Sequence, residues 1–188
     1  AAAVVRFPEA ARLSGTVTDA DGRPLAGAPV TLQIAGFSGF ADRLRTVSGR
    51  DGGWSASLSS QYTRTLRAVA QLPGGFHVAT PPLPAKVAPR IDVRAPARVL
   101  AKRVLTVSGS VAPAQRSRLV LEIARRGSDA LFHTVARVPV RAFGGRFRRV
   151  VRLRRPALHR LRVVSGADAR NVAGRSADVY VRALRAGG

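Results

Sequence analysis

The strongest constraint on the fold is an internal repeat, because the chain runs twice through the same series of short segments. The two copies are offset by about ninety residues, which is the size of one small β-sandwich. Each copy has a Ser-Gly-x-Val segment, an alternating apolar run, a Gly-Gly pair before an aromatic residue, and a second alternating run. The matched segments are 14–17 with 108–111, 30–35 with 119–124, 52–58 with 144–151, and 65–69 with 160–164. The repeat predicts two tandem domains, residues 1–90 and 91–188.

The apolar residues within each copy recur with a period of two. Leu161 and Val163, for example, alternate with Arg160 and Arg162. Such alternation is typical of antiparallel strands with one dry face and one solvated face. No segment has a sustained helical period, and 18 glycines and 12 prolines separate the short runs. The sequence predicts an all-β fold of two tandem antiparallel β-sandwiches, Ig-like or transthyretin-like.

The joint between the copies is expected near residue 90. Residues 80–84 (Thr-Pro-Pro-Leu-Pro) favour a stiff extended segment over a flexible tether. Residues 86–94 then alternate apolar with polar, so the last strand of the first copy should run almost directly into the first strand of the second. The prediction is a short, stiff linker.

The segment Ser14 to Leu32 closely resembles the opening of carboxypeptidase regulatory-like domains and related bacterial Ig-like domains. Its Asp-Gly-x-Pro-Leu-x-Gly-Ala-x-Val turn and strand match their pattern, and residues 51–54 (Asp-Gly-Gly-Trp) fit their later Asp-Gly-x-aromatic element with one extra glycine. The second copy, on its Ser-Gly-x-Val start and residues 174–181, is similar to Ig-like modules of secreted actinobacterial proteins. The resemblance implies spacers, adhesion units or accessory domains, and it carries no catalytic residues.

Charge is distributed very unevenly between the copies. The net charge is +22, of which residues 91–188 contribute +17, and all but two of the 32 basic residues are arginine. One interpretation is a GC-rich genome, which encodes arginine and alanine wherever it can. The other is a face that binds phosphate or sulfate, since guanidinium groups pair bidentately with such anions. Composition leaves both open.

The segment from Gly144 to Val164 holds eight arginines in 21 residues. Its alternation predicts two strands, 146–155 and 159–165, with an apolar inner face and an arginine outer face. Arg149 falls on the apolar parity, which predicts a bulge or strand end near it. If the two strands are neighbours, one solvent-facing sheet carries a polyanion-binding site. Its candidate residues are Arg148, Arg152, Arg154, Arg160 and Arg162.

Other candidate sites are weaker. Asp19, Asp21 and Asp51 are too few oxygen ligands for a calcium loop and favour turns. The three histidines lack metal-ligand spacing, the chain has no cysteine, and no carboxylate pair stands out for catalysis. Phe37 and Phe40, on a Gly/Ser-rich loop, have the character of a stacking site, but packing against the sandwich end is favoured.

The sequence therefore predicts a non-enzymatic structural or interaction module, with no cofactor, no bound metal and no membrane span. The Ala-rich start, as left after signal-peptide removal, favours a secreted or cell-surface protein. The expected partner is a protein or a cell-envelope component. The alternative is a polyanion-binding protein that uses the arginine-rich face of the second domain for an anionic cell-wall polymer, a polysaccharide or nucleic acid.

Overall fold

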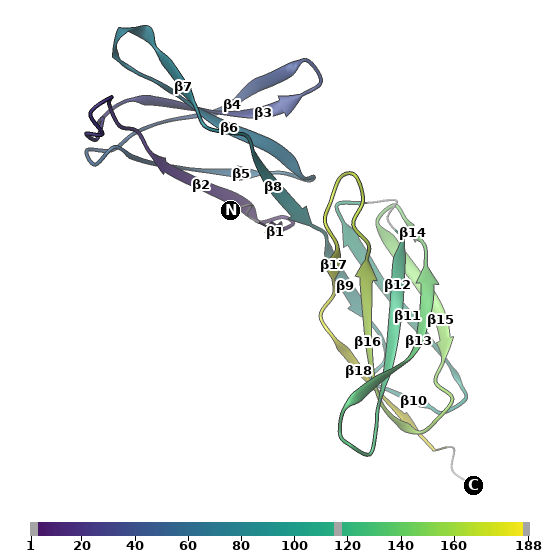
Figure 1. The fold of residues 1–188 in the computed structure, drawn as a ribbon. Coiled ribbons are helices and arrows are strands. Elements are labelled where there is room, and N and C mark those ends of the chain that lie inside the picture. Colours follow the sequence, from purple (N-terminus) through teal and green to yellow (C-terminus); the bar gives the residue numbers. More distant parts are fainter. Residues whose placement is uncertain (1–3, 115–117, 186–188) are drawn as a thin grey trace. The chain divides into compact units, whose positions relative to one another are not determined.

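The computed structural model describes residues 4–114 and 118–185. Its regular structure consists of β-strands and one short 3-10 turn, which confirms the predicted all-β fold class (Figure 1). The chain divides into two compact units, residues 1–87 and 88–188. No helix in the described part of the chain is both long enough and apolar enough to cross a membrane.

Unit 1 is a sandwich of a two-stranded sheet and a six-stranded sheet. The two-stranded sheet pairs β2 with β5; the larger sheet has the order β1-β8-β6-β3-β4, with β7 beside β6. Its elements are β1 (Val4–Arg6), β2 (Ala10–Thr16), β3 (Pro29–Gly36), β4 (Gly39–Val47), β5 (Gly53–Ser59), β6 (Arg64–Gln71), the 3-10 turn η1 (Pro73–Gly75), β7 (His77–Ala79) and β8 (Leu83–Ala88).

The core of unit 1 consists of the inward-facing residues of these strands. Leu32 on β3 and Leu66 on β6 are completely buried, and Val30 is nearly so. Ala56 on β5 and the partly buried Trp54 pack in one cluster with Val30 and Leu32 from the opposite sheet. The period-two pattern thus places the apolar residues between the sheets, as hydrophobic burial requires.

The turns of the Asp-Gly motifs meet at one end of unit 1. The Asp19 carboxylate accepts hydrogen bonds from the backbone N–H groups of Asp21 (2.9 Å) and Arg23 (2.8 Å), which closes the first turn. Gly52 has φ +72°, and its carbonyl accepts a hydrogen bond from the N–H of Val17 (2.9 Å). A side chain at Gly52 would begin 2.5 Å from the Val17 carbonyl oxygen, so this position requires glycine.

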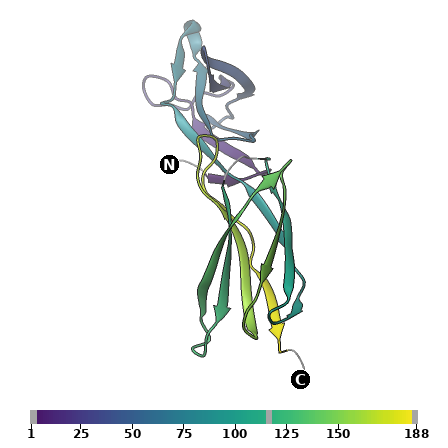
Figure 2. The ribbon, with the colours of Figure 1, turned by 90° about the vertical axis from the view of Figure 1, so that its right-hand side faces the viewer.

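Unit 2 is a sandwich of a four-stranded and a six-stranded sheet (Figures 1 and 2). The four-stranded sheet has the order β14-β15-β11-β9; the six-stranded sheet has the order β10-β18-β16-β12-β13, with β17 beside β16. Its strands are β9 (Arg90–Arg94), β10 (Arg98–Leu100), β11 (Val104–Ala112), β12 (Leu119–Arg126), β13 (Phe132–Val140), β14 (Ala142–Phe143), β15 (Arg146–Arg152), β16 (Ala157–Ser165), β17 (Gly174–Arg175) and β18 (Val179–Leu184).

The six-stranded sheets of the two units have the same strand order. The order β1-β8-β6-β3-β4 becomes β10-β18-β16-β12-β13, and the additional short strand pairs with β6 in one unit and with β16 in the other. Across from them, β2 pairs with β5 as β11 pairs with β15. The internal repeat is therefore a repeat of topology, as expected for tandem sandwiches.

A glycine–aromatic pair explains why the Ser-Gly and Gly-Gly-aromatic segments recur together. Gly15 on β2 lies directly opposite Trp54 on β5, and Gly109 on β11 lies directly opposite Phe147 on β15. A β-carbon on Gly15 would lie 3.0 Å from the Trp54 ring, and one on Gly109 would lie 2.5 Å from the Phe147 ring. The aromatic ring occupies the space that the glycine leaves, and this sets the register of the pair.

The expectation that the two arginine-rich strands share a sheet is wrong. β15 belongs to the four-stranded sheet and β16 to the six-stranded sheet. Phe147 and Val151 on β15 and Leu161 and Val163 on β16 lie in one core cluster, so the polar faces of the two strands point to opposite sides of the unit. Alternation identifies the buried face of a strand but not the sheet that contains it.

The bulge expected near Arg149 is also absent from the described pairing. β15 pairs with β11 without a register shift from Arg146 to Arg152, and Arg149 lies opposite Val107 in mid-strand. Arg149 keeps its inward parity yet is exposed, because the sandwich is open beside β15.

Candidate functional site

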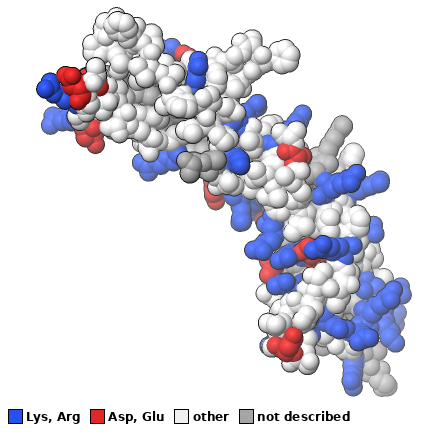
Figure 3. All heavy atoms as spheres, in the orientation of Figure 1, with Lys and Arg blue, Asp and Glu red and all other residues white. Residues whose placement is uncertain are grey.

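The structure divides the five predicted arginines into three groups. Arg148 and Arg152 lie on the outer face of β15, Arg154 follows the end of that strand, and Arg160 and Arg162 lie on the outer face of β16. Figure 3 shows Lys and Arg side chains gathered over unit 2, with few acidic ones among them. The two faces differ in how many of these charges are paired within the chain.

Glu122 neutralises the centre of the six-stranded sheet. It lies on β12 directly between Arg137 on β13 and Arg162 on β16. Its Oε2 atom is 2.6 Å from Nε of Arg162, and its Oε1 atom is 3.2 Å from Nε of Arg137. The Glu122 side chain is only 10% exposed, so its largely desolvated carboxylate accepts a hydrogen bond from Arg162 and forms an ion pair with Arg137.

Arg160 is also engaged within unit 2. Its guanidinium group lies 5.1 Å from the centre of the Phe132 ring and 3.8 Å from the Asp178 carboxylate. The Phe132 ring in turn contacts Tyr180, with 5.7 Å between ring centres. Arg160 and Arg162 are each only 24% exposed, so this part of the predicted site has its charge satisfied by neighbouring strands.

The outer face of the four-stranded sheet has a different character. Ser108 on β11 lies directly between Arg94 on β9 and Arg148 on β15, since it is the register partner of both. Partners directly opposite in an antiparallel sheet point to the same face. Two residues along, nearer to β14, Ser110 lies between Asp92 on β9 and Arg146 on β15 in the same way. Arg152 lies on the same face at the other end of β15. We call this surface the arginine–serine face; its arginines are Arg94, Arg146, Arg148 and Arg152, its hydroxyl groups are those of Thr106, Ser108 and Ser110, and Asp92 and Val150 lie on the same side.

On the arginine–serine face, the hydroxyl groups of β11 lie between the arginine of β9 and the arginines of β15. Neighbouring strands lie about 4.8 Å apart, so β9 and β15 are roughly 10 Å apart. Within the described residues, no carboxylate lies within ion-pair distance of Arg94, Arg146, Arg148 or Arg152. The one acid of this face, Asp92, pairs with Arg90 at 3.2 Å. These guanidinium groups remain available to an external anion.

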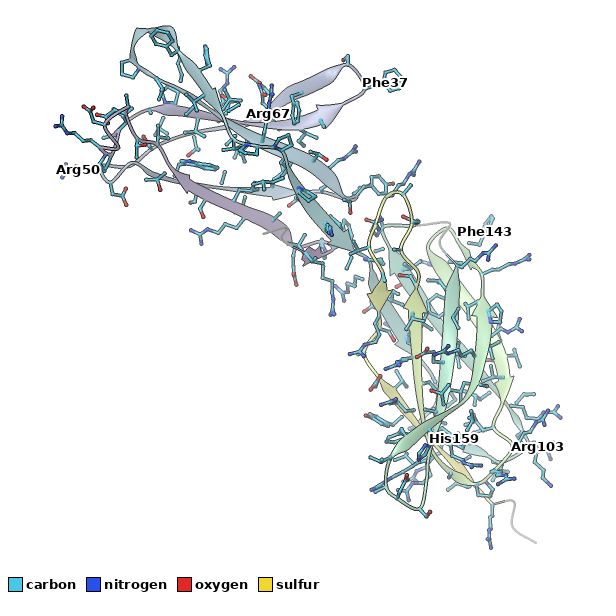
Figure 4. All side chains as sticks on the ribbon, in the orientation of Figure 1. Phe37, Arg50, Arg67, Arg103, Phe143 and His159 are labelled. Carbon is cyan, nitrogen blue, oxygen red and sulfur yellow. The ribbon has the colours of Figure 1, made fainter. Side chains whose placement is uncertain are left out.

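An aromatic side chain stands at the edge of this face. Phe143 on β14 lies opposite Arg146, on the same side of the sheet, and is 93% exposed. It projects from the end of the β14–β15 hairpin in Figure 4. The Gly144-Gly145 turn that holds it has both residues at positive φ, as a two-residue hairpin with the strand twist demands. An exposed ring beside arginines can stack on a base or a sugar.

Arg94, Arg146 and the β11 hydroxyls were not among the predicted site residues. The signal for them is present in the sequence, because residues 90–94 and 104–111 alternate as clearly as 146–152 do. The alternation does not predict that β11 pairs with both β9 and β15. Long-range strand neighbours are decided by the fold, not by local pattern.

A groove lies at the open side of the sandwich, between β13 and β15. It has a volume of about 930 Å³ and is lined by Val135, Arg149, Arg152, Arg154 and His159, among others. His159 points inward from β16 and is 2% exposed (Figure 4). Burial lowers the pKa of His159; the hydrogen bond to the Ala157 carbonyl opposes this shift, and the charge of Arg125 adds to it.

The remaining candidates do not form sites in the structure. Among the described residues, no three His, Asp or Glu side chains gather closely enough to hold a metal ion. Phe37 is fully exposed at the tip of the β3–β4 hairpin (Figure 4). Phe40 lies under the Arg67 guanidinium group, 4.1 Å from ring centre to guanidinium carbon. The expected packing of these rings into the sandwich end is therefore not seen.

Comparison with known proteins assigns the chain to no family. Neither a protein-family model nor a curated protein matches the chain. Among solved structures, the chain is similar to the native conformation of the alpha-2-macroglobulin of E. coli, with 15% sequence identity and a TM-score of 0.36. The match covers 96% of this chain and 14% of that protein. A likeness at this TM-score carries no argument about function.

Proposed function

We propose that the chain is a non-enzymatic interaction module and that its second unit binds a linear anionic polymer through the arginine–serine face. The observation that carries the proposal is the contrast between the two faces of unit 2. Within the described residues, Arg160 and Arg162 are paired with carboxylates of their own chain, whereas the arginines of the arginine–serine face are not. Unpaired arginines on one sheet face repel one another unless an anion lies across them.

The setting of the proposal is a secreted or cell-surface protein. The resemblance of residues 14–32 to carboxypeptidase regulatory-like domains, and of unit 2 to Ig-like modules of secreted actinobacterial proteins, supports this setting. In it, unit 1 serves as a spacer, adhesion or assembly unit. The ligand class is an anionic cell-wall polymer, an anionic polysaccharide or nucleic acid, whose phosphate, sulfate or carboxylate groups are the anions that guanidinium binds.

The proposal is tested by the triple variant Arg146→Gln, Arg148→Gln and Arg152→Gln, with heparin chromatography and titration of a labelled DNA duplex. The variant should elute from heparin at lower salt than the parent chain. Its plot of log affinity against log salt concentration should become shallower by about 0.9 for each DNA phosphate that the variant no longer neutralises.

The matched control removes the same charge from unit 1, by Arg12→Gln, Arg43→Gln and Arg50→Gln. All three of these side chains are exposed. A site on unit 2 predicts that the control retains most of the affinity of the parent. Equal losses of affinity in the two triple variants would show attraction by net charge alone and would contradict the proposal.

A further inference from the structure

β15 has one backbone edge that lacks a strand partner over most of its length. On one side β15 pairs with β11 from Arg146 to Arg152. On the other side β14 pairs only with Phe147 and Arg146. In the described part of unit 2, no strand lies beside residues 148–152 on that side.

The polar groups at this edge can be assigned from the pairing. The N–H of Val111 donates to the carbonyl of Gly145 (2.8 Å), so the odd-numbered residues of β15 direct their backbone groups toward β11. In an antiparallel ladder the backbone groups of successive residues point to opposite sides. Arg148, Val150 and Arg152 therefore direct their N–H and C=O groups toward the open side, which is the side of the groove.

The groove beside this edge is basic and has apolar walls. Five of its lining residues are arginines and none is acidic. Val150 on β15 and Val135 on β13, at the two sides of the groove, are 53% and 50% exposed. Large aliphatic side chains beside unpaired backbone groups are what an added strand covers. The arginines that line the groove are Arg125, Arg149, Arg152, Arg154 and Arg155.

The backbone of the opposite rim of the groove blocks strand addition, whereas the backbone of β15 does not. β13 is the edge strand of the six-stranded sheet, and it contains Pro139 and a register shift that leaves Val135 without a partner on β12. Prolines and bulges are the usual means of blocking an edge. Residues 148–152 contain neither, so their positive charge is the main feature that keeps other strands away.

We propose that the free edge of β15 binds an extended, acidic segment of a partner protein as an additional strand. The carboxylates of the segment would point into the groove toward its arginines, and its β-branched residues, on the other face of the added strand, would cover Val150. Charge complementarity selects this occupant over a second copy of the chain, whose net charge of +22 would be repelled. The site borders the arginine–serine face and shares Arg152 with it, but it differs in using the backbone edge of β15.

The test uses a labelled seven-residue peptide of alternating valine and glutamate, added to the full chain and followed by fluorescence anisotropy. We expect saturable binding that weakens with salt. Two N-methylated peptides, one methylated at every valine amide and one at every glutamate amide, separate strand addition from charge attraction. One of them should lose at least tenfold in affinity and the other should not, since only one edge of the peptide faces β15.

In the protein, the variant Val150→Pro removes one backbone N–H group at the free edge of β15. It leaves the backbone hydrogen bonds between β15 and β11 in place. Val150→Thr keeps the N–H and is the matched control. Val150→Pro should lose at least tenfold in peptide affinity, Val150→Thr should stay within twofold, and both should keep the heparin elution and circular dichroism of the parent. Equal peptide affinity in both variants, or in both methylated peptides, would overturn the inference and leave the proposed heparin site untouched.

Discussion

At the scale of single residues, the arginines of unit 2 differ in what surrounds them. Arg162 is bonded to a buried carboxylate, whereas Arg148 faces serine and solvent. An arginine of the first kind stabilises the fold, and its removal leaves Glu122 partly unpaired. An arginine of the second kind contributes little to stability, so its replacement reports on binding alone. This distinction decides which arginines are suitable for functional tests.

Glycine residues with the same backbone conformation also differ in their surroundings. Gly22 and Gly52 have φ of +80° and +72°, but a β-carbon on Gly22 would meet no atom within 4 Å. We expect Gly22→Ala to lower the free energy of unfolding by about 1–2 kcal/mol, the cost of a left-handed conformation. Gly52→Ala should cost about 3 kcal/mol or more, because it also displaces the Val17 carbonyl.

Urea unfolding followed by tryptophan fluorescence measures both glycine variants. Trp54 is the only tryptophan and lies in unit 1, so its signal reports the unit that holds both glycines. If the two variants lose the same free energy, the close approach of Gly52 to Val17 does not matter for stability.

At the scale of strands, sequence alternation correctly predicted which residues of β15 and β16 are buried. Phe147, Val151, Leu161 and Val163 all lie in the core. Alternation could not predict that β15 and β16 lie in different sheets, because it contains no information on strand neighbours. The arginine–serine face needs β9, β11 and β15 side by side, so only part of the site was accessible from the sequence.

The ion pairs of Arg137 and Arg162 follow from the position of Glu122 opposite both residues on neighbouring strands. We expect Glu122→Gln to lower the free energy of unfolding by about 1.5–3 kcal/mol, since it removes the negative charge that pairs with two guanidinium groups. The same change should raise the salt needed to elute the chain from heparin, because Arg137 and Arg162 are freed. Unfolding is followed by circular dichroism, which reports on both units, and Trp54 fluorescence identifies the transition of unit 1.

Asp178→Asn provides the matched control, since it removes one negative charge, from the residue that precedes β18 in the same unit. Its contact with Arg160 is 3.8 Å long and the carboxylate is 31% exposed, so the decrease in unfolding free energy should stay below about 1 kcal/mol. Equal decreases in the two variants would mean that burial of Glu122 does not strengthen its ion pairs.

At the scale of the whole molecule, the dominant property is a net charge of +22 on 188 residues. Charge of one sign destabilises a compact state by self-repulsion, and salt screens that repulsion. We expect the melting temperature to rise when sodium chloride is raised from about 10 to about 200 mM, over which the Debye length falls from about 30 Å to less than 10 Å. Differential scanning calorimetry measures the shift.

The triple variant of Arg146, Arg148 and Arg152 lowers the net charge from +22 to +19 and serves as the comparison. Its melting temperature should respond less to salt than that of the parent chain. A melting temperature that falls with salt would show that attractive ion pairs, such as those of Glu122, outweigh the repulsion.

The glycine–aromatic pair has a consequence for folding fidelity. Since Gly15 and Gly109 each accept an aromatic ring, β2 could mispair with β15 in the register that sets Gly15 against Phe147. Tandem domains with like strands are prone to such exchange. In that register Arg12 would lie opposite Val150, diagonally between Arg148 and Arg152, and like charges at these positions oppose pairing. The arginines of β15 thus discriminate against the wrong partner strand while the chain is still folding.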